Sequence, residues 1–322
     1  MKVSVALCTY NGEKFLKAQI DSILFQTQKV DEIIVCDDKS SDSTIAILEN
    51  YKFNNPDVFK IYKNEVNLRS VKNFEKAISL CTGDIIFLSD QDDVWTENKV
   101  EKYIEYFENH PTIDVLASNG YCIDENSTVH EKYSIWDVPQ FLQENGIRVD
   151  YFAIIGALSN IATGASIAIR KTFVVKIIPF PEAKNYHHDE WIALVAAEKN
   201  NFELLNEKYW YYRIHNKQQV GGVFCAKKNK NKNKLVSLYR NDAAQVSFNA
   251  YKRRLRKIST LHNTFSNICT DCQPHKIIIQ DNKISLKKSY LLSKKEMAKF
   301  YPIRYFLLKC TDHFLSKRKI NF

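Results

Sequence analysis

Residues 84–95 have the sequence Asp84-Ile-Ile-Phe-Leu-Ser-Asp-Gln-Asp-Asp-Val-Trp95, in which an apolar run ends in three carboxylates. A short apolar run of this kind is typical of a buried strand in a parallel sheet. The acids Asp90, Asp92 and Asp93 then lie at the C-terminal tip of that strand. Acids at positions i and i+2 on such a tip can share a hard divalent cation, which prefers oxygen ligands. The alternative is that Asp90 and Asp92 solvate a turn and that Asp93 caps the following helix.

Strand and helix patterns alternate through the first 120 residues. Apolar, β-rich runs occupy residues 3–8, 32–36, 59–62 and 84–89. Apolar residues recur at helical spacing over residues 15–25, 45–51, 71–81 and 100–107. Strands that are regularly separated by helices imply right-handed crossovers and a parallel sheet covered on both faces. We therefore predict an α/β fold with a Rossmann-like, mostly parallel sheet flanked by helices.

Three of the predicted strands end in polar residues that suit a ligand: Cys8-Thr-Tyr-Asn11, Asp37-Asp38 and Asp90-Gln-Asp92. In open sheets of this kind, ligands bind outside the C-terminal ends of the strands. The three ends together predict one cleft that holds a nucleotide and a metal.

Two common nucleotide-binding motifs are missing from the sequence. No Gly-x-Gly-x-x-Gly follows the first strand and no Walker lysine loop occurs, which disfavours a dinucleotide oxidoreductase and a P-loop phosphotransferase. The chain has only eight glycines, so backbone amides are not expected to cradle phosphate. A metal held by carboxylates and bridging the phosphates is the remaining solution.

The chain has 322 residues with 45% hydrophobic content, which favours one large domain with an appendage. Its net charge of +9 is unevenly distributed. Residues Val223–Phe322 carry 23 Lys and Arg against 5 Asp and Glu, whereas Met1–Gly222 carries 23 against 32. We therefore divide the chain into a domain at 1–222 and a basic, mainly helical extension at 223–322, with different partners.

Several features predict where the protein is found. No early segment has the layout of a signal peptide, and no run of about 18 apolar residues could span a membrane. The eight cysteines are scattered, with only Cys269 and Cys272 in a close pair, which is weak evidence for zinc. Reduced thiols and a cytoplasmic location are expected.

Six stretches follow one another in order along about the first 220 residues: Val3–Asn11, Ile34–Thr44, Leu88–Trp95, Thr163–Arg170, His188–Leu194 and Tyr212–Gly221. Together they resemble the family 2 glycosyltransferases, whose catalytic domain has the GT-A fold. Ile34–Thr44 is similar to that family's "VDDGSxDxT" segment. Leu88–Trp95 looks like its DxD region, in the variant common among rhamnosyl and related bacterial polysaccharide transferases. His188–Leu194 resembles its "HDWW" element, and Tyr212–Gly221 its "YRxHxxNxxG" element.

The resemblance implies which residues bind the donor nucleotide. Thr9, Tyr10 and Asn11 would lie at the base and ribose, and Asp90 would reach the ribose or a metal-bound water. Asp38 would accept a hydrogen bond from the N3–H of uracil or thymine, so a UDP- or dTDP-sugar is expected. The alternatives are that Tyr10 is a partly buried aromatic and that Asp38 interacts with a helix dipole.

The resemblance also implies a divalent cofactor, Mn²⁺ or Mg²⁺, with Asp92 and His215 as its ligands. The metal would offset the charge that builds on the departing nucleoside diphosphate. The alternative for His215 is a structural role.

On the acceptor side, the resemblance implies that Asp189 is the general base, which deprotonates the attacking hydroxyl and gives inversion. The neighbouring Glu190 could raise the pKa of Asp189 or replace it. The alternative for Glu190 is an acid at the start of a helix over Trp191–Ala197. His188 and Trp191 are candidates for acceptor binding, and the alternative for Trp191, which its type slightly favours, is a place in the core.

The chain departs from the family pattern at two places. The family often has Asn-Leu-Gly where this chain has Asn67-Leu68-Arg69. The arginine either changes the backbone conformation that the glycine adopts or adds a positive charge near the donor. The usual second Trp after the base is Glu190 here, which leaves two adjacent acids as alternatives for the base.

We therefore predict an inverting, metal-dependent enzyme that transfers a sugar to a glycan acceptor. The acceptor is expected to be linked to undecaprenyl diphosphate, as in O-antigen or capsule synthesis. The alternatives are a non-catalytic nucleotide-sugar-binding module and a sugar nucleotidyltransferase. The latter would need a Gly-rich basic loop, for which Asn11-Gly-Glu-Lys14 is a poor substitute.

The basic extension mixes cations with aromatic and apolar residues, as segments that lie on an anionic membrane leaflet do. We expect it to place the protein peripherally on the inner face of the cell membrane. The alternative is a solvated helical subdomain. Residues Lys227–Lys234 are expected to form a solvated linker. No nucleic-acid recognition motif accompanies the basic residues, so no nucleic-acid partner is expected.

Overall fold

The computed structural model describes residues 1–181, 186–216, 218, 224–240, 246–268, 273–315 and 318–320. Its strands are β1 Val3–Thr9, β2 Glu32–Asp37, β3 Phe59–Lys63, β4 Ile85–Ser89, β5 Val94–Trp95, β6 Val115–Ile123, β7 Val129–His130, β8 Lys132–Ser134, β9 Ala168–Arg170, β10 Phe202–Arg213 and β11 Phe224–Ala226. Its α-helices are α1 Leu16–Leu24, α2 Thr44–Asn54, α3 Arg69–Leu80, α4 Lys99–Asn109, α5 Val138–Glu144, α6 Tyr151–Ala157, α7 Lys171–Ile177, α8 His188–Glu198, α9 Asn229–Tyr239, α10 Phe248–Ser266, α11 Gln273–Phe300 and α12 Pro302–Leu315. Two 3₁₀ turns, Ile135–Asp137 and Gly164–Ser166, complete the described elements.

The main sheet has the strand order β3-β2-β1-β4-β9-β6-β10-β5, and β7 pairs with β6 beside this path. The pairs β2–β3, β1–β2, β1–β4 and β6–β10 are parallel. The short strand β9 runs antiparallel to both of its neighbours, β4 and β6. The predicted α/β fold with a mostly parallel sheet is therefore confirmed, and the 164–170 stretch proves to be a 3₁₀ turn followed by a three-residue strand.

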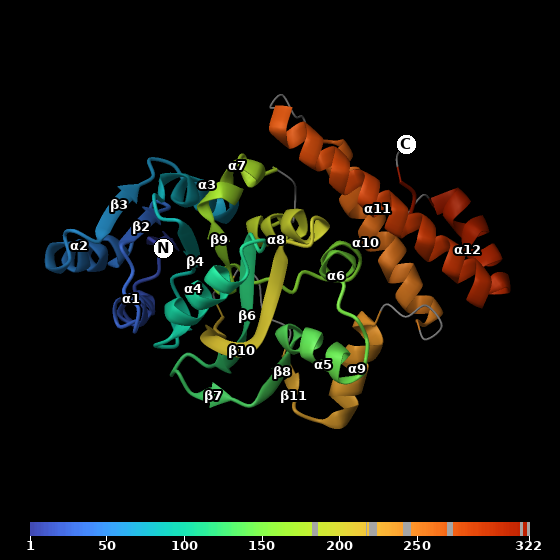
Figure 1. Ribbon diagram of the computed structural model, residues 1–322, viewed down its shortest axis with the longest axis horizontal. Helices are drawn as coiled ribbons and strands as arrows, with labels where there is room; N and C mark the ends of the chain where they lie inside the picture. The colour runs from blue at the N-terminus through green and yellow to red at the C-terminus, as the bar shows by residue number, and fades with distance from the viewer. Residues whose placement is uncertain are drawn as a thin grey trace.

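The central strands form the core of the molecule. Every residue of β1, β2 and β4 is buried, as expected of parallel strands covered on both faces. Helix α3 packs on β1 and β2 through an apolar face that contains Phe74, Ala77 and Ile78. Figure 1 shows this sheet in the body of the molecule, with β3 and α2 at one end and α11 and α12 at the other.

An acid at the edge of the core ties three segments together. The carboxylate of Glu32, at the start of β2, accepts hydrogen bonds from Ser4 of β1, from Thr82 before β4 and from Lys60 of β3. Burial alone would raise the pKa of Glu32, but these hydrogen bonds outweigh it and lower the pKa to about 2.

We expect this carboxylate to make stability depend on acid pH. Because the pKa of Glu32 is lower in the folded chain than the ordinary 4.5, its contribution is complete above pH 4.5 and is lost as the pH falls toward 2. The loss should amount to about 3 kcal/mol of unfolding free energy. Denaturant unfolding at several pH values measures it. Glu32→Gln should flatten this pH dependence, and an unchanged profile in the variant would contradict the assignment.

The C-terminal region is helical, as predicted. Helices α10 and α11 pack on each other, and both also contact α6. The ring of Phe265 on α10 meets Trp191 of α8 edge-on, with ring centroids 5.7 Å apart. The extension thus shares a core with the sheet domain. The predicted boundary between residues 222 and 223 lies outside the described residues and stays a prediction.

The prediction that Lys227–Lys234 forms a linker is wrong for most of this segment, because helix α9 begins at Asn229. The Lys-Asn repeat suggested a solvated chain. However, Leu235, Val236 and Tyr239 follow it and are buried, and α9 packs against α5.

The remaining sequence predictions concern membrane-spanning helices and the cysteine pair. In the part of the chain that the structure describes, no helix combines the length and the apolar character needed to cross a bilayer. Cys269 and Cys272 lie outside the described residues.

Candidate active site

The C-terminal ends of β1 and β4 are joined by one side chain. Gln91, in the loop after β4, accepts a hydrogen bond from the backbone N–H of Tyr10 at 2.8 Å. The amide of Gln91 also donates to the carbonyl of Tyr10 at 2.9 Å. The ring of Tyr10 is exposed, whereas Thr9 is buried and its hydroxyl donates to Asp37 at 2.8 Å. Thr9 therefore orients Asp37. Of Thr9 and Tyr10, Tyr10 is the residue whose side chain is exposed and can contact the donor nucleotide.

Asn11 joins the same loop to the end of β2. Its backbone has a φ of 48°, in the left-handed region that Asn tolerates better than most residues. Its N–H donates to Ser40 Oγ at 2.8 Å, and its side-chain oxygen accepts from the N–H of Ser41 at 2.8 Å. The side chain of Asn11 thus fixes the turn that surrounds the predicted nucleotide site.

Asp38, after β2, holds the loop in which the chain departs from the family pattern. Its carboxylate accepts hydrogen bonds from the N–H of Leu68 at 2.7 Å, the N–H of Arg69 at 2.8 Å and the amide of Asn64 at 2.9 Å. Arg69 has a φ of 62°, so it adopts the left-handed backbone that a glycine adopts readily. The turn therefore forms without glycine, and the exposed side chain of Arg69 adds a cation to this loop.

The acids after β4 form the centre of the site. Asp92 Oδ2 lies 2.8 Å from Nε2 of His215, which follows β10. The structure thus brings together the two residues predicted as metal ligands, and their metal binding stays a prediction. Arg213 fixes the loop, because its Nε donates to the carbonyl of Asp92 at 2.8 Å and its N–H to Asp93 Oδ1 at 3.0 Å.

A buried lysine lies beneath these acids. Lys99, the first residue of α4, donates to the carbonyl of Ala165 at 2.7 Å, and its Nζ lies 4.1 Å from the centre of the Trp95 ring. Burial lowers the pKa of Lys99 well below its usual value, although Asp93 and Asp90 act in the opposite direction. Lys99 thereby connects the acid loop with the 3₁₀ turn at 164–166.

Asp90 and Asp189 both lie close to Gly164. The N–H of Gly164 donates to Asp189 Oδ2 at 3.2 Å, and a Cβ at this glycine would lie 3.8 Å from Asp90 Oδ2. Burial, Asp92 and Asp189 raise the pKa of Asp90 to about 8. Burial likewise raises the pKa of Asp189, to about 6. A carboxylate with such a pKa is suited to exchange a proton near neutral pH.

The two adjacent acids on α8 have different partners. Glu190 forms an ion pair with Lys257 of α10, in addition to lying in the first turn of the helix. Asp189 instead accepts from Gly164 in the acid-rich site. Because Glu190 is neutralised by a lysine, this geometry favours Asp189 as the base.

The two acceptor-binding candidates, His188 and Trp191, are both buried and differ in their polar contacts. The ring of His188 stacks on Phe74 at 4.1 Å, and neither ring nitrogen has a hydrogen-bond partner among the described residues. Burial lowers its pKa to about 3, so the imidazole is neutral. Trp191 is fully buried, and its indole N–H donates to the carbonyl of Ile177 at 2.9 Å. The acceptor-binding prediction for Trp191 is therefore corrected to a core role.

Asp92 and His215 are a donor set that Mn²⁺ accepts and Mg²⁺ can use in part, since both ions prefer hard ligands. Within the described ranges, no group of three or more His, Cys, Asp or Glu side chains is arranged to hold a metal. A cation here would therefore need further ligands from a bound molecule.

Sequence reasoning missed the supporting residues Gln91, Lys99, Arg213 and Lys257. Lys99 looked like an ordinary cation in a helix pattern, and nothing local indicates its burial. Of these four residues, only Arg213 could have been found from the sequence, because it lies two residues before the predicted ligand His215 at the end of a strand.

Comparison with known sequences then decides the family. The sequence profile of Glycosyl transferase family 2 matches residues 4–176, which is more than half of the chain. The chain belongs to glycosyltransferase family 2. The resemblance seen in the sequence is therefore confirmed, and the protein is a glycosyltransferase that uses a nucleotide-sugar donor.

Two curated relatives illustrate the similarity. An uncharacterized glycosyltransferase of Methanocaldococcus jannaschii is 30% identical over 224 residues, which cover 67% of this chain and 71% of the relative. The dTDP-rhamnosyl transferase RfbG of Shigella flexneri is 26% identical over 252 residues, which cover 73% of this chain and 79% of that protein.

Two solved structures show the same fold. TarS of S. aureus in complex with UDP-GlcNAc has a TM-score of 0.53 at 18% identity, covering 91% of this chain and 92% of that one. The mannosyltransferase PcManGT of Pyrobaculum calidifontis, in complex with GDP-Man and Mn²⁺, has a TM-score of 0.51 at 14% identity, covering 98% and 80%. The predicted GT-A fold is thus confirmed.

Proposed function

We propose that this glycosyltransferase is inverting and metal-dependent, and that it moves a sugar from a UDP- or dTDP-sugar to a hydroxyl of a glycan acceptor. The observation that carries the proposal is that Asp90 and Asp189 both lie close to Gly164 and that Asp189 raises the pKa of Asp90. An acid loop suited to a nucleotide diphosphate and a carboxylate suited to a base thereby belong to one site.

The donor is proposed to be a pyrimidine nucleotide sugar. Asp38 Oδ2 accepts one described hydrogen bond, from Arg69, so it keeps capacity for the N3–H of uracil or thymine. The relative RfbG is named as a dTDP-rhamnosyl transferase, and TarS was solved with UDP-GlcNAc. Tyr10 and Asn11 would line the nucleoside from the end of β1, and Asp90 would reach its ribose.

Asp92 and His215 are proposed to hold Mn²⁺ or Mg²⁺, as the Mn²⁺ in the PcManGT structure suggests by analogy. When bound, such an ion supplies electrostatic stabilisation of the departing diphosphate. Arg213 holds the backbone of Asp92, and His215 contacts its carboxylate, so both parts of Asp92 are positioned before the donor arrives.

Asp189 is proposed to remove the proton from the acceptor hydroxyl as this oxygen attacks the anomeric carbon. The N–H of Gly164 orients one of its oxygens. The unpartnered nitrogens of His188 are suited to hydrogen-bond an acceptor hydroxyl nearby. Inversion follows if the attack occurs on the face opposite the leaving diphosphate.

We expect the reaction to have an acidic limb set by Asp189. A general base must be deprotonated, and the pKa of Asp189 is raised to about 6. The value of kcat should therefore fall about tenfold for each unit of pH below 6 and level off above it. Initial rates at saturating donor and acceptor between pH 4.5 and 8 measure this. A rate that stays constant down to pH 4.5 would contradict the assignment.

The acceptor is proposed to be a lipid-linked glycan, such as one on undecaprenyl diphosphate, in bacterial surface polysaccharide synthesis of the O-antigen or capsule type. The basic C-terminal region supports this, because 23 cations against 5 acids favour an anionic membrane surface. The protein would then be peripheral on the inner face of the cell membrane.

A thermal-shift screen tests the donor and the metal together. UDP, dTDP and GDP are each added with and without Mn²⁺ at about 100 times the dissociation constant of the best ligand. UDP or dTDP with Mn²⁺ should raise the Tm by about 5 °C, as expected for a ligand that binds only the folded chain. GDP should raise it less. A larger shift with GDP, or equal shifts with and without Mn²⁺, would contradict the proposed donor or the proposed metal respectively.

A further inference from the structure

The outward face of α12 is apolar. Ile303, Phe306 and Leu307 are 77%, 66% and 58% exposed, and Cys310 continues the same stripe. Their spacing of i, i+3, i+4 and i+7 places them on one side of the helix. A surface helix of a globular protein usually turns such a stripe toward the core, whereas α12 presents this one to solvent.

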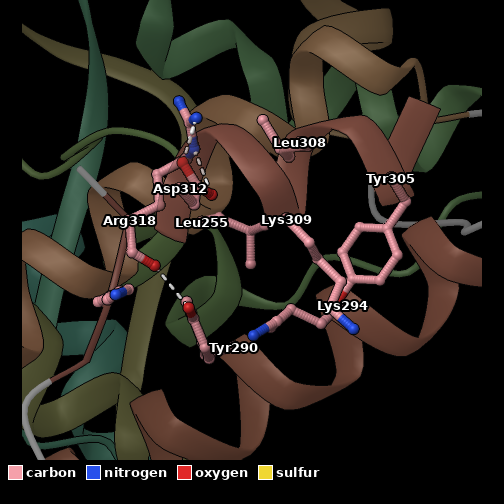
Figure 2. Close-up of a pocket in the computed structure, with 9 residues that line it drawn as sticks. Leu255, Tyr290, Lys294, Tyr305, Leu308, Lys309, Asp312 and Arg318 are labelled. Carbon is pink, nitrogen blue, oxygen red and sulfur yellow. Dashed lines mark hydrogen bonds and ion pairs between the residues drawn. The ribbon is translucent and has the colours of Figure 1, made fainter. Parts of the chain in front are cut away.

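The opposite face of α12 lies against α11. A cavity of about 140 Å³ is lined by residues of α10, α11 and α12. Figure 2 shows Leu308 and Tyr305 of α12 among the side chains around it. Leu308 is buried. Arg318 closes the cavity, because its Nε donates to Asp312 at 2.9 Å and its carbonyl accepts from the hydroxyl of Tyr290 at 2.5 Å.

Exposed cations border the apolar stripe. By helical position, Arg304 lies on one side of the stripe and Lys309 on the other, and both are exposed. Long cationic side chains of this kind can extend from an apolar boundary toward charged groups. Helix α11 repeats the arrangement, since Ile277, Ile284 and Leu291 are exposed at seven-residue spacing on a lysine-rich helix.

We propose that α12 docks on an anionic lipid bilayer, with Ile303, Phe306 and Leu307 at the boundary between headgroups and acyl chains. Arg304 and Lys309 would lie at the lipid phosphates. This inference deepens the membrane partner of the proposed function, on which it rests, by naming the surface.

Charge decides between a bilayer and a second copy of the chain as the occupant. Residues 223–322 carry 23 cations against 5 acids, so two copies that met through α12 would bring like charges together. An anionic leaflet instead offers both an apolar interior and the opposite charge. In Figure 1, α12 lies at the outer edge of the molecule, on the far side from α2 and β3, so a flat surface can approach it.

Co-sedimentation of the full chain with lipid vesicles tests the proposal. The protein is mixed with vesicles of phosphatidylcholine alone or with vesicles that also contain about 30% of the anionic lipid phosphatidylglycerol. We expect binding to the anionic vesicles only. The double variant Phe306→Ser/Leu307→Ser should lower the vesicle partition coefficient at least about tenfold, and Arg304→Glu/Lys309→Glu should do the same.

Phe53→Ser is the matched control, because Phe53 is 84% exposed on α2 at the other end of the molecule. It should bind vesicles like the unchanged protein, and all variants should keep their Tm since the altered side chains are exposed. The proposal is overturned if the unchanged protein ignores anionic vesicles or if Phe53→Ser lowers partition as much as the double variant. If light scattering shows a dimer, and Phe306→Ser/Leu307→Ser converts it to a monomer, the exposed face of α12 binds a second copy of the chain instead.

Donor binding separates this inference from the proposed function. The thermal shift with UDP or dTDP and Mn²⁺ is measured on the same variants and should be unchanged. Vesicle binding without any donor shift would leave the docking surface intact and contradict the proposed donor. A donor shift without vesicle binding would contradict the docking surface alone.

Discussion

Replacing Asp189 by Asn is expected to lower kcat by a factor of about 10²–10⁴, the usual contribution of a positioned general base. The amide cannot take the proton from the acceptor hydroxyl, yet its oxygen can still accept the hydrogen bond from Gly164. The fold and the nucleotide site should therefore be preserved. Initial rates at saturating substrates measure kcat, and calorimetric titration with UDP or dTDP and Mn²⁺ measures donor affinity, which should change less than about threefold.

Glu190→Gln is the matched control, since the two acids are adjacent on α8. Glu190 is paired with Lys257 on α10, so the variant should lower the free energy of unfolding and leave kcat within about tenfold. If Glu190→Gln loses as much turnover as Asp189→Asn, the base assignment is wrong. Equal activity of Asp189→Asn and the unchanged protein would instead favour a site without a catalytic base.

The positions of the strand ends could be predicted from the sequence, because the pattern that marks each end is local. An apolar run that stops at acids places Asp90 and Asp92 on a strand tip, and parallel neighbours bring β1 and β2 beside it. The meeting of Asp92 with His215 came from the family resemblance, since 123 residues separate them in the chain. No periodicity carries that information.

The features that were not predicted depend on long-range contacts or on rare backbone states. The choice between Asp189 and Glu190 was left open because Lys257 is 67 residues away and its pairing cannot be seen in the sequence. The geometry at Arg69 was likewise open, because a left-handed φ in a residue other than glycine is set by its surroundings, here the hydrogen bonds to Asp38. Helix α9 was missed because lysine-rich composition hid its three buried apolar residues.

Removal of divalent metal should lower turnover by at least about 10³-fold, equivalent to about 4 kcal/mol of transition-state stabilisation. Mn²⁺ or Mg²⁺ added after chelation by EDTA should restore the rate. We expect Asp92→Asn to lower kcat/KM by about 10²–10³-fold and to raise the Mn²⁺ concentration that gives half the maximal rate. The reason is that Arg213 fixes the Asp92 backbone, so the amide occupies the same place with one negative charge fewer.

Asp93→Asn separates metal binding from a general loss of charge in this loop. Asp93 is buried and its Oδ1 accepts from the N–H of Arg213, a role that an amide oxygen can keep. The variant should therefore leave the Mn²⁺ dependence within about threefold of the unchanged protein. If chelation has no effect on the rate, or if Asp92→Asn and Asp93→Asn shift the Mn²⁺ dependence equally, Asp92 is not the ligand.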